Sequence, residues 1–149
     1  MNLREDLLTL TVTCRKEVAK NISEFTLALP DGSCLPTFTP GAHITVETPS
    51  GAMRRYSLIN DGAKPTVYVI GIKREAASRG GSSSMHDSLM EGDTIRVETP
   101  ENDFELAPAS KYLLIAGGIG ITPILSMARH LKKEGIPFRL IYCTRAIEE

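Results

Sequence analysis

The sequence is poor in the residues that build metal centres and disulfide frameworks. Its 149 residues include only three cysteines, Cys14, Cys34 and Cys143, which lie far apart in the chain. An odd number of isolated cysteines does not suit a disulfide framework, and no two have the short spacing of zinc or iron–sulfur ligands. The three histidines lack metal-ligand spacing as well. We therefore expect no metal site and no iron–sulfur cluster in this chain.

An excess of one charge and a long apolar run are also missing. The formal net charge is −1, so composition does not point to a nucleic-acid partner. No apolar run approaches the roughly 20 residues that cross a bilayer. Arg4, Glu5 and Asp6 stand where a signal peptide would need an apolar core. These observations predict a cytoplasmic protein that binds neither nucleic acid nor a membrane.

The first hundred residues alternate short β-type runs with turn residues. The runs are rich in Val, Ile, Thr, Leu and Tyr, and Pro, Asp, Gly and Ser separate them. Such spacing predicts a small antiparallel barrel or sandwich. The expected strands are Leu8–Val18, Ser23–Leu29, His43–Thr48, Arg54–Ile59, Thr66–Lys73 and Thr94–Thr99.

One short helix is expected to interrupt these strands. It covers Ser82–Met90, with a serine at its start as the capping residue. Met85 has the spacing of a residue on its apolar face, so we expect it in the core rather than at a ligand.

The pattern changes after Pro108. Tyr112–Ala116 is a continuous apolar run, which is typical of a strand buried on both faces. A helix is expected next, capped by Thr122 with Pro123 in its first position, and Gly135 should end it. Phe138–Cys143 is a second apolar strand, so the order β–α–β predicts the start of a parallel sheet.

This second unit is too small to complete a sheet. We divide the chain into a barrel, residues 1–108, and the first part of an α/β nucleotide-binding domain, residues 109–149. Two strands and one helix would leave apolar faces uncovered. We therefore expect either a truncated protein or a partner chain that completes the sheet.

The glycine loop Gly117–Gly120 lies between the first of these strands and the helix. Small residues there let a ligand approach the backbone, and a helix N-terminus favours a phosphate. The loop differs from the common dinucleotide fingerprint because Pro123 replaces the third glycine. A tight turn without a ligand is the alternative.

Two further motifs suit a planar, phosphorylated ligand. In Arg54-Arg55-Tyr56-Ser57, a guanidinium can pair with phosphate and a ring can pack on a heterocycle. In the second, Gly71-Ile72-Lys73-Arg74 is followed by the serine- and glycine-rich stretch Arg79-Gly80-Gly81-Ser82, so backbone amides, hydroxyls and cations converge on one anion. The alternatives are a solvated arginine pair and a flexible polar loop.

In this order, the motifs resemble ferredoxin–NADP⁺ reductase-like proteins, in particular the phthalate dioxygenase reductase and vanillate demethylase reductase branch. Pro40-Gly41-Ala42-His43 and Glu91-Gly92-Asp93 belong to the same pattern. The resemblance covers nearly the whole chain. It implies a six-stranded antiparallel Greek-key barrel that binds FMN, with FAD as second choice, and an α/β domain for NADH or NADPH. It also implies hydride transfer to the flavin and single-electron delivery to an oxygenase or ferredoxin-type iron–sulfur acceptor.

The resemblance also implies roles for individual residues. Ser57, near the reactive N5 edge of the flavin, and Thr122, where flavin meets nicotinamide, are the expected catalytic positions. The expected flavin contacts are Arg54, Arg55, Tyr56 and Ser57 around the ring, Gly71, Ile72 and Lys73 along the ring or ribityl chain, and Arg79, Gly80, Gly81 and Ser82 at the phosphate. The expected dinucleotide contacts are Gly117, Gly118, Gly120 and Thr122.

The sequence departs from this family in three respects. The remainder of the nucleotide domain and the ferredoxin domain are absent, and Glu101 stands where the family often has a basic residue. The first two departures leave an alternative open: a flavin-binding fragment or regulatory module without turnover of its own.

Overall fold

The structure is a computed structural model that describes residues 7–76 and 79–145. Arg4, Glu5 and Asp6, on which the argument against a signal peptide rests, lie outside the described residues. Among the residues described, no helix combines the length and the apolar character needed to cross a membrane.

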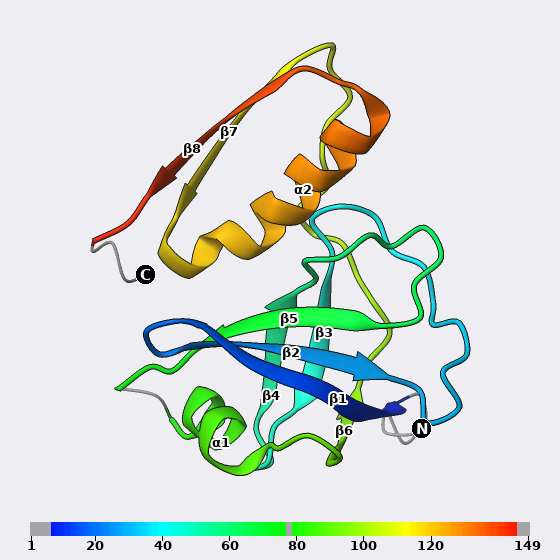
Figure 1. Ribbon diagram of the computed structural model, residues 1–149, viewed down its shortest axis with the longest axis vertical. Coiled ribbons are helices and arrows are strands. Elements are labelled where there is room, and N and C mark those ends of the chain that lie inside the picture. The colour runs from blue at the N-terminus through cyan, green and yellow to red at the C-terminus, as the bar shows by residue number, and fades with distance from the viewer. Residues whose placement is uncertain (1–6, 77–78, 146–149) are drawn as a thin grey trace.

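Six strands form one curled antiparallel sheet (Figure 1). The order β4-β3-β6-β1-β2-β5 inserts β6 between two hairpins, which is a Greek-key arrangement. The edge strands meet just after β4, where the Ile59 N–H donates to the Val69 carbonyl at 2.9 Å. The expected six-stranded antiparallel barrel is therefore confirmed. Its strands are β1 (Leu8–Ala19), β2 (Ile22–Ala28), β3 (His43–Glu47), β4 (Met53–Ser57), β5 (Tyr68–Lys73) and β6 (Thr94–Val97).

The strand bounds agree with the sequence expectation to within two residues, and the differences of two residues are at the start of β5, the end of β6 and the end of β4. The expected strand runs to Ile59, but β4 ends at Ser57. Beyond Ser57 the chain changes partners: the Leu58 N–H donates to the Ala42 carbonyl, whereas Ile59 bonds to Val69. This change brings the chain after β4 against β5 and closes one end of the barrel.

The barrel core comes from the alternation of buried side chains along the strands. On β2, Phe25 and Leu27 are completely buried, as are Leu10 on β1 and Tyr68 on β5. The Tyr68 hydroxyl donates to the Pro36 carbonyl at 2.6 Å, and burial raises the pKa of this phenol to about 12.

The helix α1 (Gly81–Ser88) lies between β5 and β6 in the chain. Met85 is fully buried among the barrel residues, which confirms the sequence expectation. The expected serine cap is wrong: the N-cap is Gly80, with φ 97°, and Ser82 is already inside the helix. A left-handed backbone at the cap suits glycine, and it lets the helix begin one residue earlier than expected.

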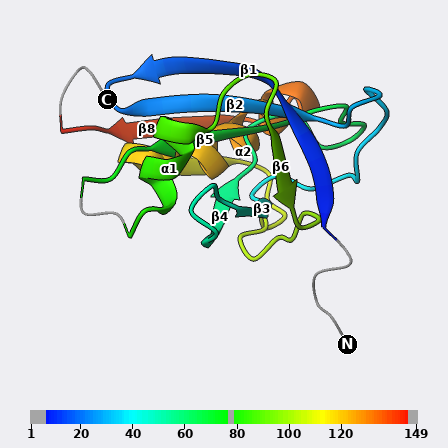
Figure 2. The same ribbon diagram turned by 90° about the horizontal axis from the view of Figure 1, so that it is seen from below.

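The second unit contains β7 (Tyr112–Gly117), a 3-10 turn (Gly118–Gly120), α2 (Ile121–Glu134) and β8 (Phe138–Cys143). Strands β7 and β8 pair in parallel, as expected. The helix α2 lies between this sheet and the barrel (Figure 1), and in the view from below it lies behind the barrel strands (Figure 2). It ends at Gly135, which has φ 69° and donates its N–H to carbonyls of the last turn.

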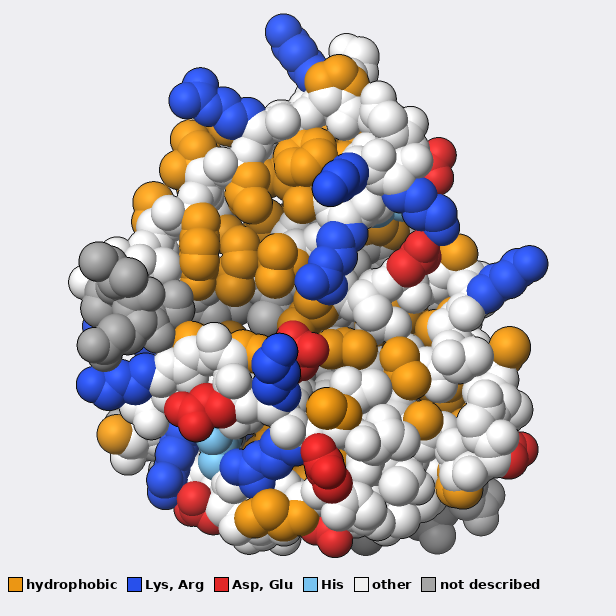
Figure 3. Space-filling view, viewed as in Figure 1, with side chains coloured by type: hydrophobic (Ala, Val, Ile, Leu, Met, Phe, Trp, Pro, Cys, Tyr) orange, Lys and Arg blue, Asp and Glu red, His pale blue; other side chains and the backbone are white. Residues whose placement is uncertain are grey.

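Two expectations for this unit are wrong. Thr122 does not cap α2 and Pro123 is not its first residue, because the 3-10 turn runs directly into the helix at Ile121. Strand β7 is buried on one face only: Leu114 is 5% exposed, but Leu113 and Ile115 are 59% and 61% exposed. A single helix covers one face of the two-stranded sheet, so apolar side chains of the other face remain at the surface, as the small size of the unit predicts. Figure 3 shows hydrophobic side chains gathered on the part of the molecule that contains this unit.

Candidate functional site

A cleft of about 550 Å³ opens where β4, β5, the start of α1 and the start of α2 approach one another. The elements come from four separate parts of the chain, which the fold brings to one side of the barrel (Figure 1). The residues that line it are Arg54, Arg55, Tyr56, Ser57, Gly71, Ile72, Lys73, Glu75, Arg79, Ser82, Ile119, Gly120, Thr122 and Pro123.

The cleft gathers most of the residues that the sequence motifs single out. Four of the expected contacts do not line it, namely Gly80, Gly81, Gly117 and Gly118. Three lining residues were missed: Glu75, Ile119 and Pro123. Pro123 adjoins the expected Thr122. No sequence signal identifies Glu75, because an acidic residue is not expected beside a phosphate-binding loop.

The side chain of Arg54 lies across the first residue of α1. A Cβ added at Gly81 would stand 2.9 Å from Arg54 Nε and 3.1 Å from its Cγ. Only glycine therefore allows the arginine to pass so close to the helix start. A further hydrogen bond, from Arg54 Nη1 to the Met53 carbonyl at 2.9 Å, supports the guanidinium.

The start of α1 adds backbone donors to this cation. The first amides of a helix lack partners within the helix and attract anions. Ser82, in the first turn, accepts the Glu75 N–H at 3.1 Å through its hydroxyl oxygen, which ties the end of the loop to the helix. Arg54 and Arg79 bring positive charge to the same wall of the cleft. This end of the cleft can bind a phosphate.

The part of the cleft formed by Tyr56 on β4 and Gly71 on β5 is suited to a flat group. Tyr56 is half-buried and packs against the barrel core. Burial raises the pKa of its phenol, and the positive charge of Arg54 acts in the opposite direction. On β5, Gly71 presents no side chain: a Cβ there would stand 3.2 Å from Thr122 Cγ2 and 3.4 Å from Ile59 Cδ1. Gly71 therefore lets the start of α2 approach the barrel.

Thr122 connects this wall with the glycine loop. The residue is 8% exposed, and its hydroxyl donates to the Ile119 carbonyl at 3.2 Å. Gly117 and Gly118, the glycines of this loop that do not line the cleft, are the last residue of β7 and the first of the 3-10 turn. The Gly118 carbonyl accepts the Tyr142 hydroxyl at 3.1 Å. Gly117 pairs with Cys143 in the parallel sheet. Gly120 is thus the glycine of this loop that faces the cleft.

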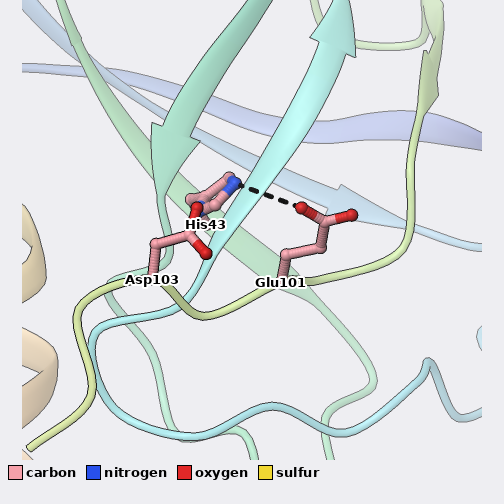
Figure 4. Close-up of side chains that lie close together, drawn as sticks. All are labelled: His43, Glu101 and Asp103. Atoms are coloured by element: carbon pink, nitrogen blue, oxygen red, sulfur yellow. Dashed lines mark ion pairs between the residues drawn. The ribbon is translucent and has the colours of Figure 1, made fainter.

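Beside the cleft lies a charged group that sequence spacing did not reveal, formed by His43, Glu101 and Asp103 (Figure 4). His43 is opposite Ser57 in the β3–β4 pair, and its Nε2 lies 4.0 Å from Glu101 Oε2. Asp103 forms a 3.5 Å ion pair with Arg55, so the group supports the outer arginine of the cleft. The carboxylates of Glu101 and Asp103 are mostly exposed, and that of Asp103 is paired with Arg55. The group therefore places negative charge next to an arginine of the cleft.

A larger cavity of about 630 Å³ lies elsewhere, between barrel loops and the second half of α2. Its lining includes Phe38, Asp61 and Arg129 but none of the residues expected at a cofactor. Arg129 donates to the Ile59 carbonyl at 3.1 Å, and Lys133 pairs with Asp61 at 2.6 Å. These contacts hold α2 on the barrel; the smaller cleft carries the convergent cations and helix start that a phosphorylated ligand needs.

The amino-acid sequence is similar to those of known proteins. Residues 9–106 match the family model described as the oxidoreductase FAD-binding domain. The chain is 52% identical over 138 residues to the phthalate 4,5-dioxygenase oxygenase reductase subunit of Pseudomonas putida, covering 91% of this chain and 43% of that protein. It is 45% identical over 143 residues to a vanillate O-demethylase oxidoreductase of Pseudomonas putida, covering 95% of this chain and 45% of that protein.

A solved structure of phthalate dioxygenase reductase is also similar. It is described as a modular structure for electron transfer from pyridine nucleotides to 2Fe–2S, and it superposes with a TM-score of 0.93 at 46% identity. The match covers 95% of this chain and 45% of the other. The chain thus spans less than half the length of the curated relatives it matches.

Proposed function

Because this chain belongs to the oxidoreductase FAD-binding domain family, we propose that the cleft between β4, β5 and α1 holds the flavin of an NAD(P)H-dependent reductase. The observation that carries the proposal is the position of Arg54 across Gly81, beside the start of α1. A cation, helix amides and a serine hydroxyl converge there at one end of the cleft, and Tyr56 and Gly71 also line it.

The residues present fit a flavin at both ends. Arg54, Arg79 and Ser82, which line the cleft, would hold a phosphate through charge-assisted hydrogen bonds. The amides of Gly80 and Gly81, at the start of α1 beside the lining residues, would add to these bonds. Tyr56 and Ser57 on β4, facing Gly71, Ile72 and Lys73 on β5, would hold the ring and its chain. In this proposal Ser57 lies at the ring edge, opposite His43 in the sheet.

FMN is the flavin that we propose, with FAD as the second choice. The phosphate-binding end of the cleft lies directly at the start of α1, so a ligand that ends in a single phosphate satisfies it. The family description names FAD, and FAD would need additional contacts for its adenylate half.

The nicotinamide side of the cleft is the start of α2. Gly120 and Thr122 line it next to the β5 wall, so a dinucleotide on the loop Gly117–Gly120 would bring its nicotinamide towards the flavin ring. Bound flavin would supply the redox chemistry, accepting a hydride from NADH or NADPH and releasing electrons singly. We propose an oxygenase or ferredoxin-type iron–sulfur protein as the acceptor, in line with the functions named for the relatives.

A second candidate is a flavin-binding module without turnover of its own. The exposed Leu113 and Ile115 favour it, since a two-stranded sheet with one uncovered face offers little surface to a dinucleotide. The division into a barrel, residues 1–108, and a nucleotide unit, residues 109–149, belongs to the same proposal. Two separate hydrophobic clusters support this division, although Leu106, before the boundary, packs against the second cluster.

The cytoplasmic location stays a prediction.

Two measurements on the chain as it stands test the proposal. Titration of flavin-free protein with FMN and with FAD, followed by flavin fluorescence, should give the tighter binding for FMN. Steady-state oxidation of NADH and NADPH with ferricyanide then separates the candidates, because a module without turnover binds flavin but shows no rate. A protein that binds neither FMN nor FAD would overturn both candidate functions.

A further inference from the structure

His86 joins the two walls of the cleft. It lies on α1, whose start lines the phosphate end, and its Nε2 is 2.8 Å from the carbonyl oxygen of Ile72 on β5. Ile72 itself lines the cleft. A carbonyl only accepts, so Nε2 must carry the proton and donate. The imidazole thus fixes α1 to the strand that forms the ring wall.

Both the ring and the backbone of His86 are held in place. The imidazole packs edge-on against Phe25 of β2, with ring centroids 6.4 Å apart and planes at 81°. The guanidinium of Arg15 on β1 lies 5.4 Å from the Phe25 centroid. It donates to the His86 carbonyl and, at 2.8 Å, to the Leu89 carbonyl at the end of α1. The donor therefore has little freedom to leave Ile72.

The other contacts of α1 do not duplicate this link. Ser82 bonds to the Glu75 N–H, and Ser84 accepts the Ser50 N–H at 3.3 Å; both hold the first turn to loops. The Arg74–Asp87 ion pair, at 2.9 Å, joins groups that are about half exposed, so it contributes little. The bond from His86, in contrast, joins the helix to β5 itself.

We propose that His86 is a positioning residue that sets the spacing between the phosphate end and the ring wall of the cleft. The proposal rests on the proposed flavin site. A ligand that contacts both walls depends on their spacing, whereas a ligand that contacts only the ring wall does not. FMN and riboflavin differ only by the phosphate, so His86 should govern the preference for FMN over riboflavin.

The test measures dissociation constants of FMN and riboflavin for wild-type protein, His86→Leu and His86→Gln. Leucine keeps much of the volume against Phe25 but removes the donor; glutamine can place an amide N–H near the position of Nε2. For His86→Leu we expect the Kd of FMN to rise about tenfold, the effect of one lost hydrogen bond, with less than about a twofold change for riboflavin. His86→Gln should restore most of the FMN preference. His130→Leu, on α2 away from α1, is the matched control and should leave the preference unchanged.

A merely structural role would weaken both ligands equally or only lower the melting temperature, and either result contradicts the proposal. So does a glutamine variant that behaves like leucine. If His86→Leu does not fold, Arg15→Met decides, because it leaves the His86–Ile72 bond in place and frees only the end of α1. The proposal then expects an unchanged preference for FMN over riboflavin, and loss of that preference would overturn it. Failure of the flavin site itself is distinguishable, because wild-type protein would then bind neither ligand.

Discussion

The side chain of Arg54 passes so closely over Gly81 that a Cβ at position 81 would stand 2.9 Å from Arg54 Nε. The two residues lie on β4 and at the first residue of α1, respectively, far apart in sequence. Their contact combines the arginine motif and the glycine-rich motif into a single anion-binding corner. Substitution of either residue should therefore weaken binding of a phosphorylated ligand at this corner.

Gly81→Ala should weaken FMN binding without destabilising the protein. Alanine favours a helix over glycine by up to about 1 kcal/mol, so the melting temperature should stay level or rise. The added Cβ must displace Arg54, and we expect the Kd of FMN to rise about tenfold. Ser83→Ala, two residues further along α1, is the control. Unchanged FMN affinity in Gly81→Ala would mean that Arg54 does not serve the phosphate from this position.

Arg54→Met should reduce FMN affinity by roughly 10- to 100-fold, since hydrogen bonds to charged groups contribute about 1.5–3 kcal/mol. The residual affinity should depend less on salt, because a charge pair has been removed. Titration at two ionic strengths checks both effects. Arg96→Met removes an arginine that pairs with Glu47 outside the cleft and should change neither. Equal losses in the two variants would refute a specific role for Arg54.

Gly71→Ala should destabilise the contact between the barrel and α2. The new methyl would lie 3.2 Å from Thr122 Cγ2, and overpacking of this kind costs about 1–3 kcal/mol of unfolding free energy. Thr122→Ser removes that methyl group and keeps the hydroxyl. The double variant should therefore recover part of the loss in denaturant unfolding. Strict additivity of the two changes would argue against the contact.

Tyr68 should make stability fall at alkaline pH. Its folded pKa of about 12 lies above the ordinary value of 10, so the folded state holds the proton more tightly. The contribution is complete below pH 10 and is lost as the pH rises from 10 through 12. Tyr68→Phe lacks this term, so the difference in unfolding free energy between wild type and variant should shrink over that range. A difference independent of pH would contradict the assignment.

Substitutions on the two faces of β7 should differ in their effect on the unfolding free energy. Ile115 is 61% exposed, and Ile115→Lys should change the unfolding free energy by no more than about 0.5 kcal/mol while reducing self-association through the apolar face. Leu114 is 5% exposed, and even Leu114→Ala should cost about 2–5 kcal/mol. Denaturant unfolding and sedimentation velocity measure the two effects. Severe destabilisation by Ile115→Lys would show that the outer face is covered.

The sequence predicts the barrel well because period-2 patterns and turn residues are local signals. Phe138–Cys143 has the expected bounds, and all six strands of the barrel begin within two residues of their expected positions. The helix starts were wrong since caps depend on backbone conformation: Gly80 adopts φ 97°, and a 3-10 turn precedes Ile121. Neither conformation follows from a local preference of serine or threonine.

The contacts between motifs in space could not be predicted from the sequence. The motifs named the arginines and glycines of the cleft, but the approach of Arg54 to Gly81 depends on how the sheet curls. The bond from His86 to Ile72 joins residues 14 apart through a carbonyl, which no side-chain pattern reveals. The same holds for His43, Glu101 and Asp103, which meet only because β3 pairs with the segment after β6.

The most direct test of the central claim is the flavin content of the purified chain. Absorption spectroscopy, with the cofactor released by heat and identified by mass, gives both the amount and the identity of any flavin after reconstitution. The account predicts FMN at close to one per chain. Protein that takes up no flavin would contradict the cleft as a flavin site, and FAD in place of FMN would contradict the assignment of its phosphate end.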